Sequence, residues 1–151
     1  MLFRSAMGLE AWSRGAAAVH LVESDVKTHR ILAANSKKIS DKFGQESRER
    51  PVTVRKDNAL GWLKQFKSQY EGWDEEKQMN TILFFDPPYE KKDLYQDVAA
   101  YTLREWFVGR VWIESDRQKG LSADHWEGWG EQFVKTYFQG TSYIAVLDLR
   151  G

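Results

Sequence analysis

The sequence lacks several features that would indicate particular classes of protein. None of its 151 residues is cysteine, so it has neither a disulfide framework nor a thiolate metal site, as suits a reducing cytoplasm. The formal net charge is zero, and no global basic field indicates nucleic acid or an anionic membrane as a partner. The three histidines (His20, His29 and His125) lack the spacing of metal ligands, so we expect no metal. No apolar run reaches 18 residues, which disfavours secretion and membrane spanning.

The residues that are present are those of an ordinary globular protein. Hydrophobic residues make up 42% of the chain and charged residues 29%. A chain of this length can bury a proper core, and we expect a single domain over residues 1–151. Of the seven tryptophans, Trp12, Trp62 and Trp112 fit core positions. Trp126 and Trp129 stand in a polar segment, where we expect an exposed loop.

Helical and extended patterns alternate along the chain. Apolar runs predict strands at 17–23, 52–56, 81–85 and 109–115. Apolar spacing predicts helices at 6–15, 24–39, 58–70 and 91–107, with charged connectors at 40–51 and 71–80. The last two segments, 131–138 and 142–149, predict an antiparallel hairpin. Alternation of this kind predicts an α/β fold with a mainly parallel sheet covered on both faces.

Polar residues follow the apolar part of three predicted strands. Glu23 ends the first, Asp57 and Asn58 follow the second, and Asp86 follows the third. Ligands of parallel sheets bind at the carboxyl ends of the strands. The sequence therefore predicts a binding site along this edge, with the four residues in it.

The segment that follows the third strand is "DPPY", residues 86–89. Its two prolines fix the backbone and remove two N–H donors, and they hold Asp86 in an extended geometry. The Asp86 carboxylate and the Pro87 carbonyl can then both accept hydrogen bonds from one amino group. Tyr89 offers a flat face to a planar ring. Two acceptors and a stacking surface form a clamp for a base that carries an exocyclic amine.

DPPY resembles the (D/N)PP(Y/F/W) signature of class I methyltransferases, which use S-adenosylmethionine to methylate amino nitrogens. The whole chain resembles one family more closely, the RsmD family, which methylates N2 of a guanine in 16S ribosomal RNA. The resemblance is carried by segments spread over nearly all of the sequence: "GLEAWSRGA", "HLVESD", "NALGWL", "VWIESD" and "GTSYIAVLDL". It implies a Rossmann-like methyltransferase sheet that ends in the antiparallel hairpin.

The resemblance also implies roles for individual residues. Gly8 would belong to the cofactor loop, and Glu23 would accept hydrogen bonds from the ribose hydroxyls of S-adenosylmethionine. Asn58 would contact the adenine amine, with Asp57 as the competing choice. Asp86, Pro87 and Tyr89 would hold the guanine amine while its nitrogen attacks the methyl group.

Two lysines and a proline complete the expected substrate contacts. Pro88 would lie against the base, and Lys91 and Lys92 would meet RNA phosphates, although both lysines also fit a solvated helical turn. The implied partner is 16S rRNA or an assembly intermediate of the small ribosomal subunit, which is met in the cytoplasm.

The first residues depart from the family pattern, which reads LFAGSGAxGLEA. Here "RS", Arg4 and Ser5, stands where the family has A-G-S-G, and the first strand is largely missing. We expect the shortened loop to weaken binding of the methionine end of the cofactor. A homo-oligomer would fill the gap left by the strand. The alternative function is that of a catalytically inactive, truncated remnant that acts as a binding or structural protein.

Overall fold

The structure, a computed structural model, describes residues 8–9, 11–23, 25–57, 59–85, 103–118 and 121–151. The chain divides into two compact units, Met1–Phe66 and Lys67–Gly151, and each is described by itself. The expectation of one domain over the whole chain stays a prediction. No helix in the described ranges is long and apolar enough to cross a membrane.

The first unit contains a parallel pair of strands and a long helix. Its elements are β1 (Val19–Glu23), α2 (Val26–Glu49), β2 (Val52–Lys56) and the larger part of α3 (Ala59–Glu71). Helical residues 8–9 and 11–13 precede β1. The strands pair in parallel from Val19 opposite Val52 to Glu23 opposite Lys56, so their carboxyl ends lie at one edge. Both strands begin within two residues of the bounds that the sequence predicts.

The core of the first unit gathers around Trp12. This side chain is 4% exposed and packs with Val19, Leu21 and Leu32. Its indole nitrogen Nε1 donates a 2.6 Å hydrogen bond to the carbonyl of Arg50, and the Arg50 guanidinium lies 4.6 Å from the ring. One tryptophan thus fastens the segment before β1 to the residue that follows α2. Trp12 occupies the core position predicted for it.

Helix α2 is longer than the sequence predicts. Residues 40–49 continue the helix, whereas their many charges indicate a connector. Polar side chains one turn apart support the helix: Arg50 pairs with Glu46 at 3.0 Å, and the Gln45 amide donates to Glu49 at 3.0 Å. Gly44 interrupts the regular geometry with φ of 39°, a backbone conformation that favours glycine.

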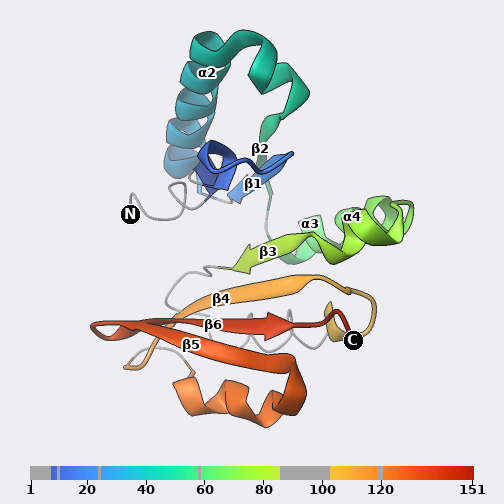
Figure 1. The fold of residues 1–151 in the computed structure, drawn as a ribbon. Helices are drawn as coiled ribbons and strands as arrows, with labels where there is room; N and C mark the ends of the chain where they lie inside the picture. The colour runs from blue at the N-terminus through green and yellow to red at the C-terminus, as the bar shows by residue number, and fades with distance from the viewer. Residues whose placement is uncertain (1–7, 10, 24, 58, 86–102, 119–120) are drawn as a thin grey trace. The chain divides into compact units, whose positions relative to one another are not determined.

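The second unit is built on a mixed four-stranded sheet, β3-β4-β6-β5 (Figure 1). Its elements are α4 (Glu75–Met79), β3 (Ile82–Phe85), β4 (Arg110–Asp116), the 3₁₀ helix η2 (Ala123–Gln132), β5 (Phe133–Gln139) and β6 (Ser142–Asp148). Strands β3 and β4 are parallel, and β6 is antiparallel to both β4 and β5. The predicted C-terminal hairpin is therefore confirmed. Helix α4 lies within the predicted connector 71–80, and most of the predicted helix 91–107 lies outside the described residues.

The Tyr70 hydroxyl ties together the segments that lead into this sheet. It donates to the carbonyl of Gln78 at 3.0 Å and accepts from the Val108 amide at 3.1 Å. Tyr70 is 1% exposed, and burial raises the pKa of its hydroxyl. The hydroxyl therefore stays protonated and fixes the ends of α3 and α4 against the approach to β4.

Trp126 and Trp129 correct one sequence expectation. They lie in η2, 0% and 5% exposed respectively, where the sequence predicts an exposed loop. Trp126 Nε1 donates to the Tyr143 hydroxyl at 3.1 Å, and that hydroxyl donates to the carbonyl of Leu121 at 2.6 Å. The polar neighbours mislead the prediction, because a 3₁₀ helix can turn its tryptophans inward and its acids outward. Trp112 and Trp62, predicted in the core, are only partly buried.

We predict that Trp126→Ala lowers the free energy of unfolding by about 3–5 kcal/mol, because it empties a fully buried site. Phe138→Ala serves as the control, since that ring is 57% exposed and its removal leaves no comparable cavity. Urea unfolding followed by circular dichroism measures both. An equal loss in the two variants would contradict the buried position of Trp126.

A second prediction concerns Asp148 at the end of β6. The Arg150 side chain donates to both of its carboxylate oxygens, at 2.8 and 2.6 Å, and lowers the pKa of Asp148 to about 2 from 3.8. A lowered pKa stabilises the fold above pH 3.8, and the contribution is lost as pH falls towards about 2. Arg150→Ala is expected to return the pKa of Asp148 towards 3.8, measured by NMR titration of the carboxyl carbon.

Arg110→Ala is the matched control for this titration. Its guanidinium lies 3.6 Å from Asp148 and contributes less to the lowered pKa than Arg150 does, so its removal should move the pKa less. A pKa of Asp148 that is the same in Arg150→Ala and in the unaltered chain would refute this assignment.

Candidate active site

The carboxyl ends of β1 and β2 bring two of the predicted site residues together. Glu23 is the last residue of β1, and Asp57 directly follows β2. The Asp57 amide donates to the Glu23 carbonyl at 3.2 Å, which extends the parallel ladder by one bond beyond the strands. The sequence predicts both residues at one edge, and this placement is confirmed within the first unit.

Glu23 is a buried carboxylate, 8% exposed, at the turn between β1 and α2. Its oxygen Oε1 accepts from the Asp25 amide at 2.9 Å. Asp25 in turn caps α2 by accepting from the Thr28 amide at 2.8 Å, and this bond lowers the pKa of Asp25. The turn therefore holds Glu23 in one position. Oε2 takes no hydrogen bond from the described residues, so Glu23 keeps an acceptor for a hydroxyl-bearing ligand.

Asp57 is bounded by the side chains of its own strand and of α3. Its carboxylate lies 3.6 Å from the Arg55 guanidinium, which also donates to the Gln65 side chain. The Asp57 side chain is 21% exposed, so it remains accessible from the edge of the strands. Carboxylates at two neighbouring strand ends fit a ligand that carries several hydroxyl or amine donors. The ribose and adenine of S-adenosylmethionine carry such donors.

Gly8 lies close against β1. A Cβ at this position would stand 2.3 Å from Leu21 Cδ2 and 3.2 Å from Val19 Cγ1. The missing side chain lets the segment before β1 approach the strand, a packing role that the third glycine of dinucleotide-binding loops also has. The predicted contact between Gly8 and a cofactor stays a prediction.

The other predicted site residues lie outside the described residues. These are Asn58, Asp86, Pro87, Pro88, Tyr89, Lys91 and Lys92, together with the segment that contains Leu2, Phe3, Arg4 and Ser5. Strand β3 ends at Phe85, one residue before Asp86, so the strand that leads into DPPY is confirmed. Among the described residues no group of three or more His, Cys, Asp or Glu side chains is placed to hold a metal.

Sequence reasoning does not single out the end of β4. Phe85 pairs with Ile113, and β4 continues for three more residues past this pair: Glu114, Ser115 and Asp116. The carboxyl end of β4 therefore extends beyond the last residue of β3. Glu114 is partly exposed, whereas Asp116 is 8% exposed and accepts from the Gln118 amide and the Thr141 hydroxyl. In the sequence, the segment "VWIESD" stands out only for its family resemblance.

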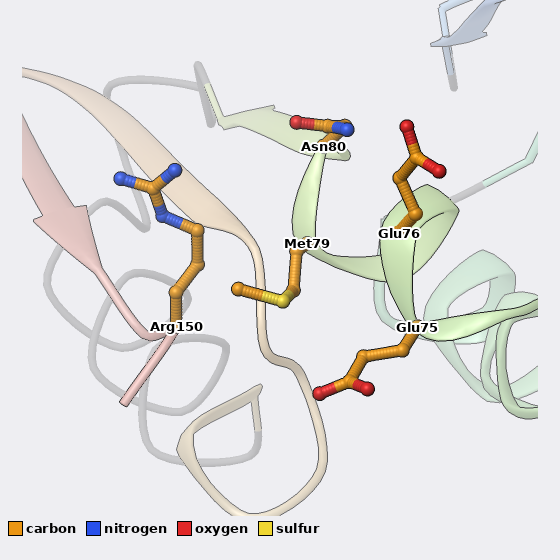
Figure 2. A pocket seen from close by; sticks show the side chains of 5 residues that line it. All are labelled: Glu75, Glu76, Met79, Asn80 and Arg150. Carbon is orange, nitrogen blue, oxygen red and sulfur yellow. The ribbon is translucent and has the colours of Figure 1, made fainter.

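A cavity of about 460 Å³ lies near the amino ends of the parallel strands of the second unit's sheet (Figure 2). It is lined by Glu75, Glu76, Met79, Asn80 and Arg150. Met79 and Asn80 precede β3, and Leu149, beside Arg150, donates to Gly109 just before β4. The cavity is therefore at the amino ends of β3 and β4. Strand β3 ends with Phe85 at the opposite, carboxyl end of the strands, so this cavity does not lie where β3 leads into DPPY.

The parallel strand pair in each unit and the C-terminal antiparallel hairpin make an α/β fold, and methyltransferases are among the solved structures that share it. A conserved hypothetical protein from Streptococcus pyogenes has 21% sequence identity and a TM-score of 0.61, over 96% of this chain and 79% of that one. A putative methyltransferase from Escherichia coli, yhhF, also has 21% identity, with a TM-score of 0.58 over 96% and 70% of the chains.

A third structure is the rRNA methyltransferase aviRa from Streptomyces viridochromogenes, with 13% identity and a TM-score of 0.56 over 97% of this chain and 71% of that one. No match to a curated protein was found. Residues 4–144 match the family model "Conserved hypothetical protein 95", and the chain belongs to this family. The match supports the RsmD-like part of the resemblance.

We predict that Gly8→Ala destabilises the fold by about 1–3 kcal/mol, because the new methyl group overlaps Leu21. Gly128→Ala is the control, since a Cβ at that position would have nothing within 4 Å and its φ is not positive. Gly8→Ala should cost less stability in a Leu21→Ala background than in the unaltered chain, because the overlapping side chain is then absent. Equal stability of the two glycine variants in urea would argue against the packing role.

Proposed function

We propose that the chain is an S-adenosylmethionine-dependent methyltransferase that acts on the exocyclic N2 of a guanine in 16S rRNA. The observation that carries the proposal is the pair of carboxylates, Glu23 and Asp57, at adjacent strand ends in a chain where β3 runs directly into DPPY. The family match and the methyltransferase structures of the same fold support the reaction class. The name of the rRNA methyltransferase among them favours RNA as the substrate.

The residues of this chain would divide the work between cofactor and substrate. Glu23 Oε2 would accept from the ribose hydroxyls while Oε1 stays bound to the Asp25 amide. Asp57 or Asn58 would accept from, or donate to, the adenine. S-adenosylmethionine, when bound, supplies a methyl group activated by its sulfonium. A charged acceptor that is already fixed by the backbone loses little entropy when the hydroxyls bind.

The substrate side of the site would orient one nitrogen. Asp86 and the Pro87 carbonyl would each accept one N–H of the guanine amine, which directs the nitrogen lone pair at the methyl carbon. The amine nitrogen would take the methyl group from the cofactor, which would leave as S-adenosylhomocysteine, and the methylated nitrogen would release a proton to solvent. Tyr89 and Pro88 would stack on the base, and Lys91 and Lys92 would meet phosphates. Orientation of the amine supplies the greater part of the rate enhancement.

The proposed partner is 16S rRNA, free or within an assembly intermediate of the small subunit, which the chain would meet in the cytoplasm. The expected homo-oligomer, in which a second copy would fill the gap where the family pattern places its first strand, also stays a proposal.

We predict that Glu23→Gln weakens S-adenosylmethionine binding about 10- to 100-fold, because hydrogen bonds to a charged acceptor are worth roughly 1.5–3 kcal/mol. Glutamine keeps a carbonyl oxygen for the Asp25 amide, so the fold should persist. Glu71→Gln, an exposed acid paired with Lys67, is the control and should bind normally. Isothermal titration with S-adenosylmethionine and S-adenosylhomocysteine measures both.

The same titration, combined with a methyl-transfer assay on 16S rRNA, separates the two functions that the sequence leaves open. Binding that depends on Glu23, followed by methyl transfer to guanine N2 in 16S rRNA, is the expected result. Binding without transfer to RNA would instead favour the inactive remnant. A folded sample that binds neither cofactor form would overturn the proposal.

A further inference from the structure

The two faces of the second unit's sheet differ in exposure along β4 and β6, although Phe138 in β5 is 57% exposed on the face that holds Tyr143. On one face Val111, Ile113, Tyr143, Ala145 and Leu147 are each 0–1% exposed. Helix η2 lies against this face, where Trp126 is hydrogen-bonded to Tyr143 (Figure 1). On the other face Ile82 is 55% exposed and Tyr137 is 45% exposed. The second face is therefore open at both of its edge strands, β3 and β5, while Val146 in β6, between Trp112 and Lys135, is 5% exposed.

The open face carries an ordered pair of aromatic rings. Trp112 on β4 and Tyr137 on β5 reach across β6, with ring centroids 6.2 Å apart and planes inclined by only 22°. The Lys135 ammonium lies 4.2 Å from the Tyr137 ring centroid, on the same face. The face thus presents two nearly parallel rings, with a positive charge over the Tyr137 ring.

An acid completes the row across the strands. Glu114 pairs with Ile144, and Ile144 pairs with Tyr137, so the three residues form a line across β4, β6 and β5. Directly paired residues have Cβ atoms about 4.5–5.5 Å apart, which places Glu114 about 10 Å from Tyr137 along the face. That span matches a base that stacks at one end and offers N–H donors at the other.

We propose that this face, defined by Trp112, Lys135, Tyr137 and Glu114, binds the bases of single-stranded RNA next to the methylated guanine. The proposal rests on the proposed function, since it assumes an RNA substrate. Tyr137 stacks on a base, Lys135 contacts the adjoining phosphate, and Glu114 accepts from the N–H donors at the edge of the base. Glu114 lies at the carboxyl end of β4, the same edge at which β3 leads into DPPY.

Features of β5 favour the open face over its backbone edge as the binding surface. The edge of β5 has a register shift between Phe133 and Lys135, and Lys135 is charged. A bulge and a lysine are devices that discourage the addition of another strand. A second copy of the chain is therefore the less favoured occupant. Its presence would appear as a dimer in the test below.

The test compares neighbouring aromatic residues on opposite faces. Tyr137 and Phe138 are adjacent in β5 and similarly exposed, at 45% and 57%. Phe138 lies on the η2 side, where its ring centroid is 6.3 Å from that of Tyr143. The full chain is titrated with a fluorescently labelled, unstructured RNA of about ten nucleotides, within the range that one single-strand binding site covers, and anisotropy gives the affinity. Tyr137→Ala should weaken binding about 5- to 100-fold, whereas Tyr137→Phe and Phe138→Ala should bind as the unaltered chain does.

The salt dependence tests the lysine. Lys135→Ala should lower the slope of log affinity against log salt concentration by about 0.7, the value for one phosphate of a single strand. Equal affinities of Tyr137→Ala and Phe138→Ala would overturn the proposal. So would a chain that binds no RNA but forms a dimer, seen by light scattering, that Tyr137→Ala dissociates.

Two further readouts separate this proposal from the proposed reaction. S-adenosylmethionine titration of Tyr137→Ala should give the affinity of the unaltered chain, because Tyr137 is not part of the cofactor site. RNA binding that depends on Tyr137 without methyl transfer would retain the face and refute the reaction. Methyl transfer with an unchanged KM for RNA in Tyr137→Ala would retain the reaction and refute the face.

Discussion

The arrangement of the second unit depends on the pairing of β4. This strand bonds in parallel to β3 on one side and antiparallel to β6 on the other. The parallel side aligns the carboxyl end of β4 with the strand that leads into DPPY. The antiparallel side attaches the C-terminal hairpin, whose β5 forms the far edge. Strand β4 therefore contributes both to the carboxyl ends of the strands, where we propose methyl transfer, and to the open face, where we propose RNA binding.

The alternation of side chains along β4 follows from the same pairing. Val111, Ile113 and Ser115 point to the face that η2 covers, while Trp112 and Glu114 point to the other. Burial of the first set fixes the register, since a slip of one residue would bring Glu114 into the core. The burial of the core thus determines that an acid and an aromatic ring stay on the open face. Packing of Val111 and Ile113 on the covered face therefore determines which side chains of β4 lie on the open face.

Features that depend on local pattern could be predicted from the sequence. Strand β2 has the bounds that the sequence predicts, because Val52 and Val54 alternate with polar residues. The adjacency of Glu23 and Asp57 also follows, since parallel strands end at one edge. The bounds of α2 do not, because charged residues suit both a connector and an exposed helix. The burial of Trp126 could not be foreseen either, since it depends on Tyr143, 17 residues later.

Tyr137 in β5 shows a further limit of prediction from the sequence. Tyr137 and Phe138 are equivalent in a sequence read alone, as neighbouring apolar residues of one strand. Only the pairing with β6 assigns them to different faces, with Tyr137 beside Trp112 and Phe138 beside Tyr143. A candidate binding residue of this kind becomes visible once three strands are in register.

The position of Gly8 bears on how a methyltransferase site could work with a shortened glycine-rich loop. Glycines in such loops serve two physical needs, close approach of backbone to ligand and close approach of helix to strand. Gly8 meets the second need, since a Cβ there would stand only 2.3 Å from Leu21. Binding of the cofactor would then depend more on side chains than on the backbone of the loop. Glu23 is suited to this dependence, because the Asp25 amide fixes one of its oxygens and leaves the other to accept.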